Sequence, residues 1–121
     1  MQTARKIRLL PTPEQERLFW KSAGVARWAY NYFLEEQQKV YSAYLENGET
    51  GKRFVSGGEV RKYINNVLKP TTHLWLKEVG SNVMKQAVKD AEEAYQRYLK
   101  GLSGKPRFKS KHKSEPKFYV N

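Results

Sequence analysis

Residues 24–44, GVARWAYNYFLEEQQKVYSAY, decide the fold because they form the longest run of the chain without proline or internal glycine. Apolar residues recur in this run at steps of three and four, beginning with Val25, Trp28 and Tyr32. That spacing is the period of a helix with one buried face. A second apolar row, which includes Ala26 and Tyr30, widens the face. The run predicts a central core helix that packs on more than one neighbour, with its tyrosine hydroxyls at an edge that faces solvent or nucleic acid.

A shorter helix is predicted before this run. Thr12-Pro13-Glu14-Gln15 combines an N-cap threonine, a proline at the first helical position and a glutamine at the return position of a capping box. We expect this helix to reach about Ser22, with Leu18 and Phe19 in the core, before a tight join at Ala23-Gly24. Helix, short turn and helix also form the pattern of a DNA-binding helix-turn-helix, although such pairs are more often packing units.

Three further helices are expected. They are a helix that ends near Leu68, a short helix with Leu74, Trp75 and Val79, and a last helix over 82–100 with a regular apolar stripe. Their expected N-caps are Ser56 with Glu59, Thr71 or Thr72, and Ser81. Gly101 is a suitable C-terminal stop. The predicted fold class is mainly α, a helical bundle of about four to five helices with a small β element formed by the N- and C-terminal segments.

The two ends of the chain carry the strand patterns. Residues 3–10 alternate apolar and basic side chains, and residues 117–120 look like the start of a strand. The expected division is residues 1–11 as an N-terminal strand, 12–101 as a helical domain and 102–121 as a basic return segment into the β element. We expect that element to be truncated. A fragment would leave the strand at 117–120 unpaired, whereas a complete protein would pair it.

The net charge of +11 is concentrated at the two ends. Residues 1–12 hold three bases and no acid, residues 102–121 hold six bases and one acid, and residues 13–101 are nearly balanced. In residues 105–113 the bases alternate with other residues, so an extended chain presents them in one row. This distribution predicts a surface that faces a polyanion, most simply nucleic acid. A general solubilising charge is the alternative.

No pattern for catalysis or metal binding is found. The chain has no cysteine, and His73 and His112 stand far apart without a second ligand at helical spacing. Asp90, the one aspartate, lies between Lys89 and Glu92, and no strained turn carries a nucleophile. We therefore expect no catalytic residue, no metal and no cofactor. No run approaches the roughly 20 apolar residues of a membrane span, so a cytoplasmic protein is expected.

Aromatic residues accompany the bases near the C-terminus. Arg107-Phe108-Lys109 and Lys117-Phe118-Tyr119 could stack bases while they neutralise phosphates. Core packing is the alternative for both phenylalanines. The three tryptophans, Trp20, Trp28 and Trp75, are expected in the core. Arg27 and Asn31 are the polar residues of the central helix that could reach nucleic acid.

Three blocks in order resemble the N-terminal region of TnpB, also called OrfB. They are LLPTPEQERLFWKSAGVARWAYNYFLE (9–35), WLKEVGSNVMKQAVKDAEEAYQRYLKG (75–101) and GKPRFKSKHK…FYVN (104–121). Each block alone is moderately specific, and the three together are strong. The family consists of transposon-encoded RNA-guided DNA nucleases of insertion sequences, related to compact type V CRISPR effectors. Its N-terminal region is also known as the helix-turn-helix of a transposase.

The resemblance implies a wedge-like β-barrel into which a helical recognition domain, residues 12–101, is inserted. It also implies that catalysis lies in a RuvC-like nuclease domain, with a zinc ribbon, that these residues do not include. Recognition of a short transposon-adjacent motif falls on Ser81, Asn82 and Lys85, with Val55-Ser56 close by. Lys85 stands where family members usually have glutamine. Glutamine reads adenine, whereas lysine prefers guanine or phosphate.

The expected function is that of a nucleic-acid-binding N-terminal module without the nuclease. Its expected partners are target DNA, a structured guide RNA and the missing C-terminal nuclease part. A free-standing DNA-binding regulatory or interaction protein, derived from such a transposon protein, is the alternative. The candidate nucleic-acid-binding residues are Arg5, Lys6, Arg8, Ser81, Asn82, Lys85, Lys105, Arg107, Phe108, Lys109, Lys111 and Lys113.

Overall fold

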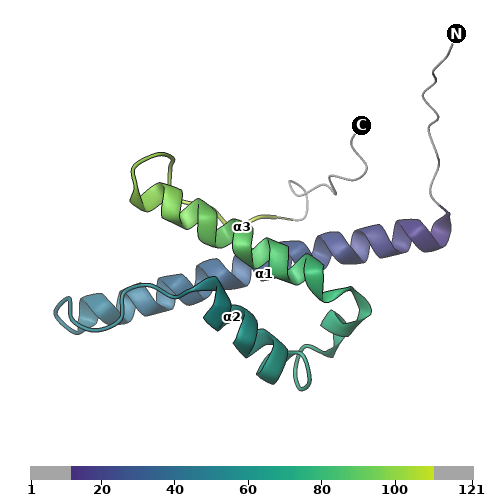
Figure 1. The fold of residues 1–121 in the computed structure, drawn as a ribbon, viewed down its shortest axis with the longest axis horizontal. Coiled ribbons are helices and arrows are strands. Elements are labelled where there is room, and N and C mark those ends of the chain that lie inside the picture. Colours follow the sequence, from purple (N-terminus) through teal and green to yellow (C-terminus); the bar gives the residue numbers. More distant parts are fainter. Residues whose placement is uncertain (1–11, 111–121) are drawn as a thin grey trace, which may run out of the picture.

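The computed structural model describes residues 12–110, and this part of the chain is mainly helical, as expected. Three α-helices, α1 (Pro13–Glu46), α2 (Gly57–Tyr63) and α3 (Ser81–Leu99), make up most of it (Figure 1). A π-helical turn η1 (Ile64–Leu68) and a 3-10 turn η2 (Leu74–Glu78) connect α2 to α3. The expected count of four to five helices is corrected to these elements, because the first two predicted helices are joined.

Helix α1 runs unbroken through the position at which a turn was expected. Its start is as predicted: the Thr12 side chain accepts a hydrogen bond from the Gln15 amide, and the Gln15 side chain accepts one from the Thr12 amide. Gly24 keeps helical geometry instead of ending the helix. A glycine inside a helix costs only about 1 kcal/mol, which the packing of a long apolar face readily offsets. The expected helix-short turn-helix is therefore wrong.

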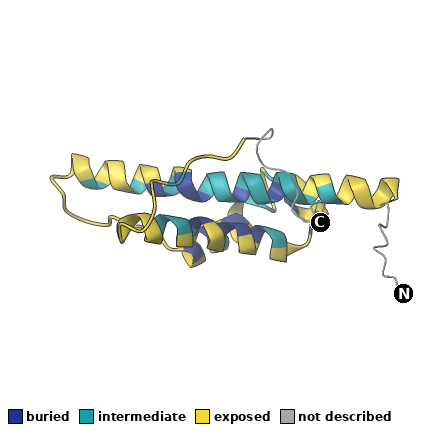
Figure 2. Ribbon diagram, turned by 90° about the horizontal axis from the view of Figure 1, so that it is seen from above, coloured by how far each residue is buried: buried dark blue, intermediate teal, exposed yellow. Residues whose placement is uncertain are grey.

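The core lies where α1 crosses α3. Val25, Ala29 and Phe33 of α1 are buried against Met84 and Val88 of α3, and Figure 2 shows the buried positions gathered in the middle of both helices. Both ends of α1 extend beyond this contact, so Leu18 and Trp20 are exposed rather than part of the core, Trp20 by 48%. The buried face of residues 24–44 thus packs as predicted. Of residues 18–20, which were expected in the core, only Phe19 is half-buried.

The connection between α1 and α3 follows the predicted order with altered details. The Ser56–Glu59 capping box forms as predicted, but the helix changes to π geometry at Ile64. Neither η2 nor α3 has a side-chain N-cap: His73 and Gly80 take those positions. The caps expected at Thr71 or Thr72 and at Ser81 are therefore wrong. Gly101 has φ of 76° after the end of α3, as expected of a left-handed stop.

No strand occurs among residues 12–110. Residues 102–110, the described part of the expected return segment, are irregular and extended. The strands predicted over 3–10 and 117–120 lie outside the described residues, as do the expected pairing or fraying of 117–120 and the packing of Phe118.

Candidate nucleic-acid interface

The basic segment that follows α3 is held against α1 by one side chain. The Asn31 amide donates to the Lys109 carbonyl oxygen at 2.9 Å, and the Lys109 amide donates to Asn31 Oδ1 at 2.7 Å. One asparagine thereby pairs with both backbone groups of one residue, as a neighbouring strand would. Figure 2 shows this segment running along the side of α1 away from α2 and α3. Asn31, expected to be free for nucleic acid, is occupied in this contact.

The side chain of Lys109 lies over a ring of α1. Its ammonium nitrogen is 4.5 Å from the centroid of the Tyr30 ring, a cation–π distance. Burial, and then the Asp90 carboxylate, raises the pKa of Tyr30, so the ring beneath the ammonium stays a neutral phenol. The register of the segment is therefore set by both the backbone and the side chain of Lys109.

The candidate residues of this segment are exposed to solvent. Lys105, Arg107 and Lys109 are exposed, and no ion pair within residues 12–110 involves them. Phe108 is 58% exposed, so core packing is the wrong alternative for this phenylalanine. The segment presents three uncompensated bases and one exposed ring. The candidate residues Arg5, Lys6, Arg8, Lys111 and Lys113 lie outside the described residues.

The first turns of α3 form a second group of candidate residues. Ser81, Asn82 and Lys85 are all exposed, and within the described part of the chain Lys85 takes part in no ion pair. No side chain caps α3, although the Val83 amide donates to the Gly80 carbonyl at 3.2 Å, and the helix dipole favours an anion at this end. The group lies at the opposite end of α3 from the start of the 102–110 segment (Figure 1).

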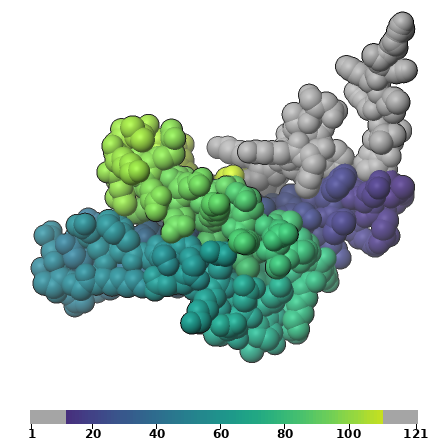
Figure 3. All heavy atoms as spheres, viewed as in Figure 1, coloured from purple at the N-terminus to yellow at the C-terminus, as the bar shows by residue number. Residues whose placement is uncertain are grey.

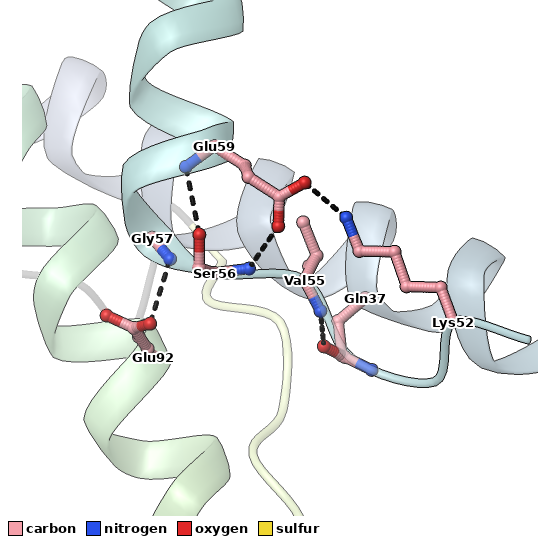
Figure 4. A network of polar contacts seen from close by, with 7 residues as sticks. All are labelled: Gln37, Lys52, Val55, Ser56, Gly57, Glu59 and Glu92. Atoms are coloured by element: carbon pink, nitrogen blue, oxygen red, sulfur yellow. Dashed lines mark hydrogen bonds and ion pairs between the residues drawn. The ribbon is translucent and has the colours of Figure 1, made fainter.

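The residues near Val55 and Ser56 occupy a different place from the one expected. The Gly57 amide donates to Glu92 Oε2 at 2.8 Å, which puts the start of α2 beside the second half of α3 (Figure 4). At 1.5 Å per helical residue this point is roughly 15 Å along α3 from Asn82. Val55 and Ser56 therefore do not join the group at the start of α3.

A part-buried contact of Gln37 and an exposed ion pair of Glu59 hold that connection, and the sequence revealed neither. Gln37, 1% exposed, donates to the Arg53 carbonyl at 3.0 Å and accepts from the Val55 amide at 3.0 Å. Glu59, which closes the capping box, also forms an ion pair with Lys52. A hydrogen bond from the Lys52 side chain, and then one from the Ser56 backbone amide, lower the pKa of Glu59. An amide on α1 thus fixes residues 53–55, in the same way that Asn31 fixes Lys109.

Within residues 12–110, no group of three or more His, Asp or Glu side chains is placed to hold a metal ion. No helix in the same range is long and apolar enough to cross a membrane.

Comparison with known proteins identifies the N-terminal part of the chain. Residues 1–46 match the helix-turn-helix domain of the OrfB proteins of IS605-type elements. Over 112 residues the chain is also 29% identical to the Escherichia coli (strain K12) protein "Putative RNA-guided DNA endonuclease InsQ". That alignment covers 93% of this chain and 26% of InsQ, so the chain spans about a quarter of the relative's length.

The resemblance to the N-terminal region of TnpB/OrfB is thereby confirmed. The name helix-turn-helix and the structure of the matching region differ in one respect. The region that matches the OrfB domain carries α1, a single helix from Pro13 to Glu46 with no turn inside it. The partner that packs across α1 is α3, which lies beyond residue 46. The helix pair of this fold is therefore formed by elements far apart in the sequence.

Proposed function

We propose that this chain is the nucleic-acid-binding N-terminal module of a TnpB-like RNA-guided nuclease, and that it contacts guide RNA and target DNA. The observation that carries the proposal is the basic segment held on α1 by Asn31, with Lys105, Arg107 and Phe108 exposed. A row of bases with an intervening ring suits a phosphate backbone with accessible bases. The OrfB domain and the similarity to InsQ support the same reading.

The start of α3 is proposed to face the DNA duplex at the transposon-adjacent motif. Ser81, Asn82 and Lys85 lie on its first turns, exposed and beside uncapped amides. Lys85 would contact guanine or a phosphate rather than read adenine, because it lacks the paired donor and acceptor of glutamine. Phosphate contacts from the 105–109 segment would position the module, and contacts from α3 would supply selectivity.

The nucleic-acid proposal is tested by binding to duplex DNA and to structured RNA over a salt series. Log affinity is expected to fall steeply with log salt, by about 0.9 per phosphate contact for a duplex. Replacing Lys105, Arg107 and Lys109 by glutamine should flatten this slope. The matched control replaces Lys21, Lys39 and Lys52, three lysines already paired with Glu78, Glu36 and Glu59, and changes the net charge equally.

Equal flattening by both triple variants would contradict the placement of the interface, and absence of binding to both nucleic acids would overturn the proposal. For α3, Lys85→Ala should weaken duplex binding by about 1–3 kcal/mol if it contacts a base, whereas Lys100→Ala, at the other end of the helix, should not. Binding to duplex without binding to structured RNA would support the DNA-binding regulatory protein instead.

A further inference from the structure

The connection between α2 and α3 carries an unbalanced positive charge. Between Glu59 and Glu78 the chain has four bases, Arg61, Lys62, Lys69 and Lys77, and no acid. The acids that border it are engaged elsewhere, Glu59 with Lys52 and Glu78 with Lys21. No ion pair formed within residues 12–110 involves any of the four bases. This charge lies inside the middle of the chain, apart from the basic ends.

The same connection exposes large side chains that the core does not use. Ile64, Leu76 and Val79 are buried and hold the connection to α1 and α3. Tyr63 and Trp75, next to these anchors in the sequence, are 48% and 42% exposed. In Figure 3 this part of the chain, coloured teal to green, forms the bulge below α1, on the side away from the 102–110 segment in Figure 1.

A layer of rings supports the exposed tryptophan from beneath. Trp28 of α1 stacks on Tyr32 with centroids 5.0 Å apart and an interplanar angle of 15°. Trp75 meets Trp28 edge-on at 5.6 Å, and His73 lies 4.9 Å from Trp28 and 5.9 Å from Trp75. Such ring pairs hold side chains in defined orientations. Trp75 is therefore a fixed ring at the surface rather than a loose one.

The backbone that presents these rings is not a regular α-helix. After Tyr63 the chain takes π geometry, and the Lys69 amide donates to the Ile64 carbonyl at 2.7 Å. The His73 amide then donates to the Leu68 carbonyl at 2.7 Å and closes the turn that delivers His73 and Trp75 to α1. Single π turns are found frequently at functional sites. Tyr63 lies close enough to Tyr32 to raise its pKa, and Tyr32 stacks on Trp28, which Trp75 meets edge-on, so Tyr63 and Trp75 border the same pair of α1 rings.

We propose that this surface, formed by Tyr63, Trp75, Lys62, Lys69 and Lys77, binds single-stranded nucleic acid. Trp75 and Tyr63 stack unpaired bases, and the three lysines neutralise the phosphates between them. Fixed aromatic rings within a region of one charge sign form the common binding surface for unpaired strands. The proposal rests on the proposed function, which supplies nucleic acid as the class of ligand. It adds a second binding surface and a single-stranded ligand.

The test uses the full 121-residue chain and fluorescently labelled thymidine and uridine oligomers of about 12 nucleotides. Trp75→Leu and Tyr63→Leu should each weaken binding about tenfold, whereas Trp75→Phe, which keeps a ring, should retain most of the affinity. The matched control is Tyr98→Leu, a 37% exposed ring on α3, which should change the affinity by less than about twofold. Circular dichroism melting establishes that each variant is folded.

Equal losses in Trp75→Leu and Tyr98→Leu, or no loss in either, would overturn the site. The duplex salt series on the same variants separates the two proposals. If wild type binds duplex and structured RNA but Trp75→Leu leaves oligomer binding unchanged, only this site is disproved. If wild type binds no nucleic acid at all, the proposed function fails as well. The thymidine and uridine arms decide whether the strand is DNA or RNA, and either preference supports the site.

Discussion

At Gly57 the first turn of α2 lies directly against α3. A Cβ added there would lie 2.7 Å from Glu92 Oε1 and 3.4 Å from a methyl group of Val88. Gly57→Ala should therefore push the flexible end of the Glu92 side chain aside and break its hydrogen bond to the Gly57 amide. Loss of a charged hydrogen bond costs about 1.5–3 kcal/mol, and the better helix propensity of alanine offsets about 0.5–1 kcal/mol of it. We expect a net loss of about 1–2 kcal/mol, measured by thermal or urea unfolding.

The adjacent glycine provides the control. At Gly58 an added Cβ would meet only the Ser56 hydroxyl at 3.9 Å, an ordinary contact. Gly58→Ala should therefore be neutral or stabilise the protein by up to about 1 kcal/mol. If both substitutions have the same effect, the close approach of α2 to Glu92 is wrong.

Tyr32 gives the fold a dependence on alkaline pH. Burial, followed by the charges of Glu36, Tyr63 and Glu35, raises the pKa of Tyr32 to about 12. The unfolded chain loses this proton near the usual value of about 10, so between these values the folded state binds more protons than the unfolded state. Its contribution to stability is therefore complete below about pH 10 and declines as pH rises towards 12. In a spectrophotometric titration, Tyr32→Phe should remove a late-titrating phenolate.

Among the helices, α1 is one long helix where the sequence predicted two, and Gly24 lies at the predicted break. Gly24 has no positive φ, and an added Cβ would meet only the Arg27 guanidinium at 3.9 Å. Gly24→Ala should therefore stabilise the protein by about 0.5–1 kcal/mol, through helix propensity and a less flexible unfolded chain. A shift of 1 kcal/mol moves the melting temperature of a domain of this size by several degrees. Destabilisation would instead indicate the turn that the sequence suggested.

The elements that local chemistry specifies were predictable. Thr12 with Gln15, Ser56 with Glu59, and Gly101 mark helix ends because their partners lie within a few residues. Gly24 was wrongly predicted to end a helix, because the packing of α1 on α3 that keeps the helix continuous cannot be seen in the neighbouring residues. The same limit applies to Trp20: its apolar character suggested the core, but its burial depends on how far α3 extends along α1.

In the candidate site, too, some features could be predicted from local sequence and others depend on distant contacts. The exposure of Lys105 and Arg107 followed from the alternating bases of the segment, and that of Lys85 from its place opposite the apolar stripe of the last helix. The roles of Asn31 and Gln37 did not follow, because each pairs with backbone groups 78 and 16–18 residues away. An amide on a helix carries no sequence signal for such a partner. The bases were thus predictable, and what positions them was not.

For the whole molecule, α1 acts as a support that fixes extended segments through side-chain amides. Gln37 fixes the 53–55 segment from a buried position, and Asn31 fixes Lys109 at the surface. The two differ in consequence, because water can replace the Asn31 contact but cannot reach Gln37. Gln37→Leu would remove the partner of the Val55 amide and of the Arg53 carbonyl in two part-buried hydrogen bonds, each worth about 0.5–1.5 kcal/mol net. Urea unfolding should show this loss, with the exposed Gln38→Leu as control.

Asn31→Leu should instead loosen the basic segment while leaving the core intact. Two exposed hydrogen bonds to Lys109 are lost, and a net cost of about 1 kcal/mol corresponds to roughly a fivefold larger population of the detached segment. Trypsin should then cleave after Arg107 faster by about that factor, with the melting temperature little changed. Nucleic-acid affinity should fall by a similar factor, because the bases at 105–109 must be ordered again on binding. Unchanged cleavage and affinity would mean that Asn31 does not position this segment.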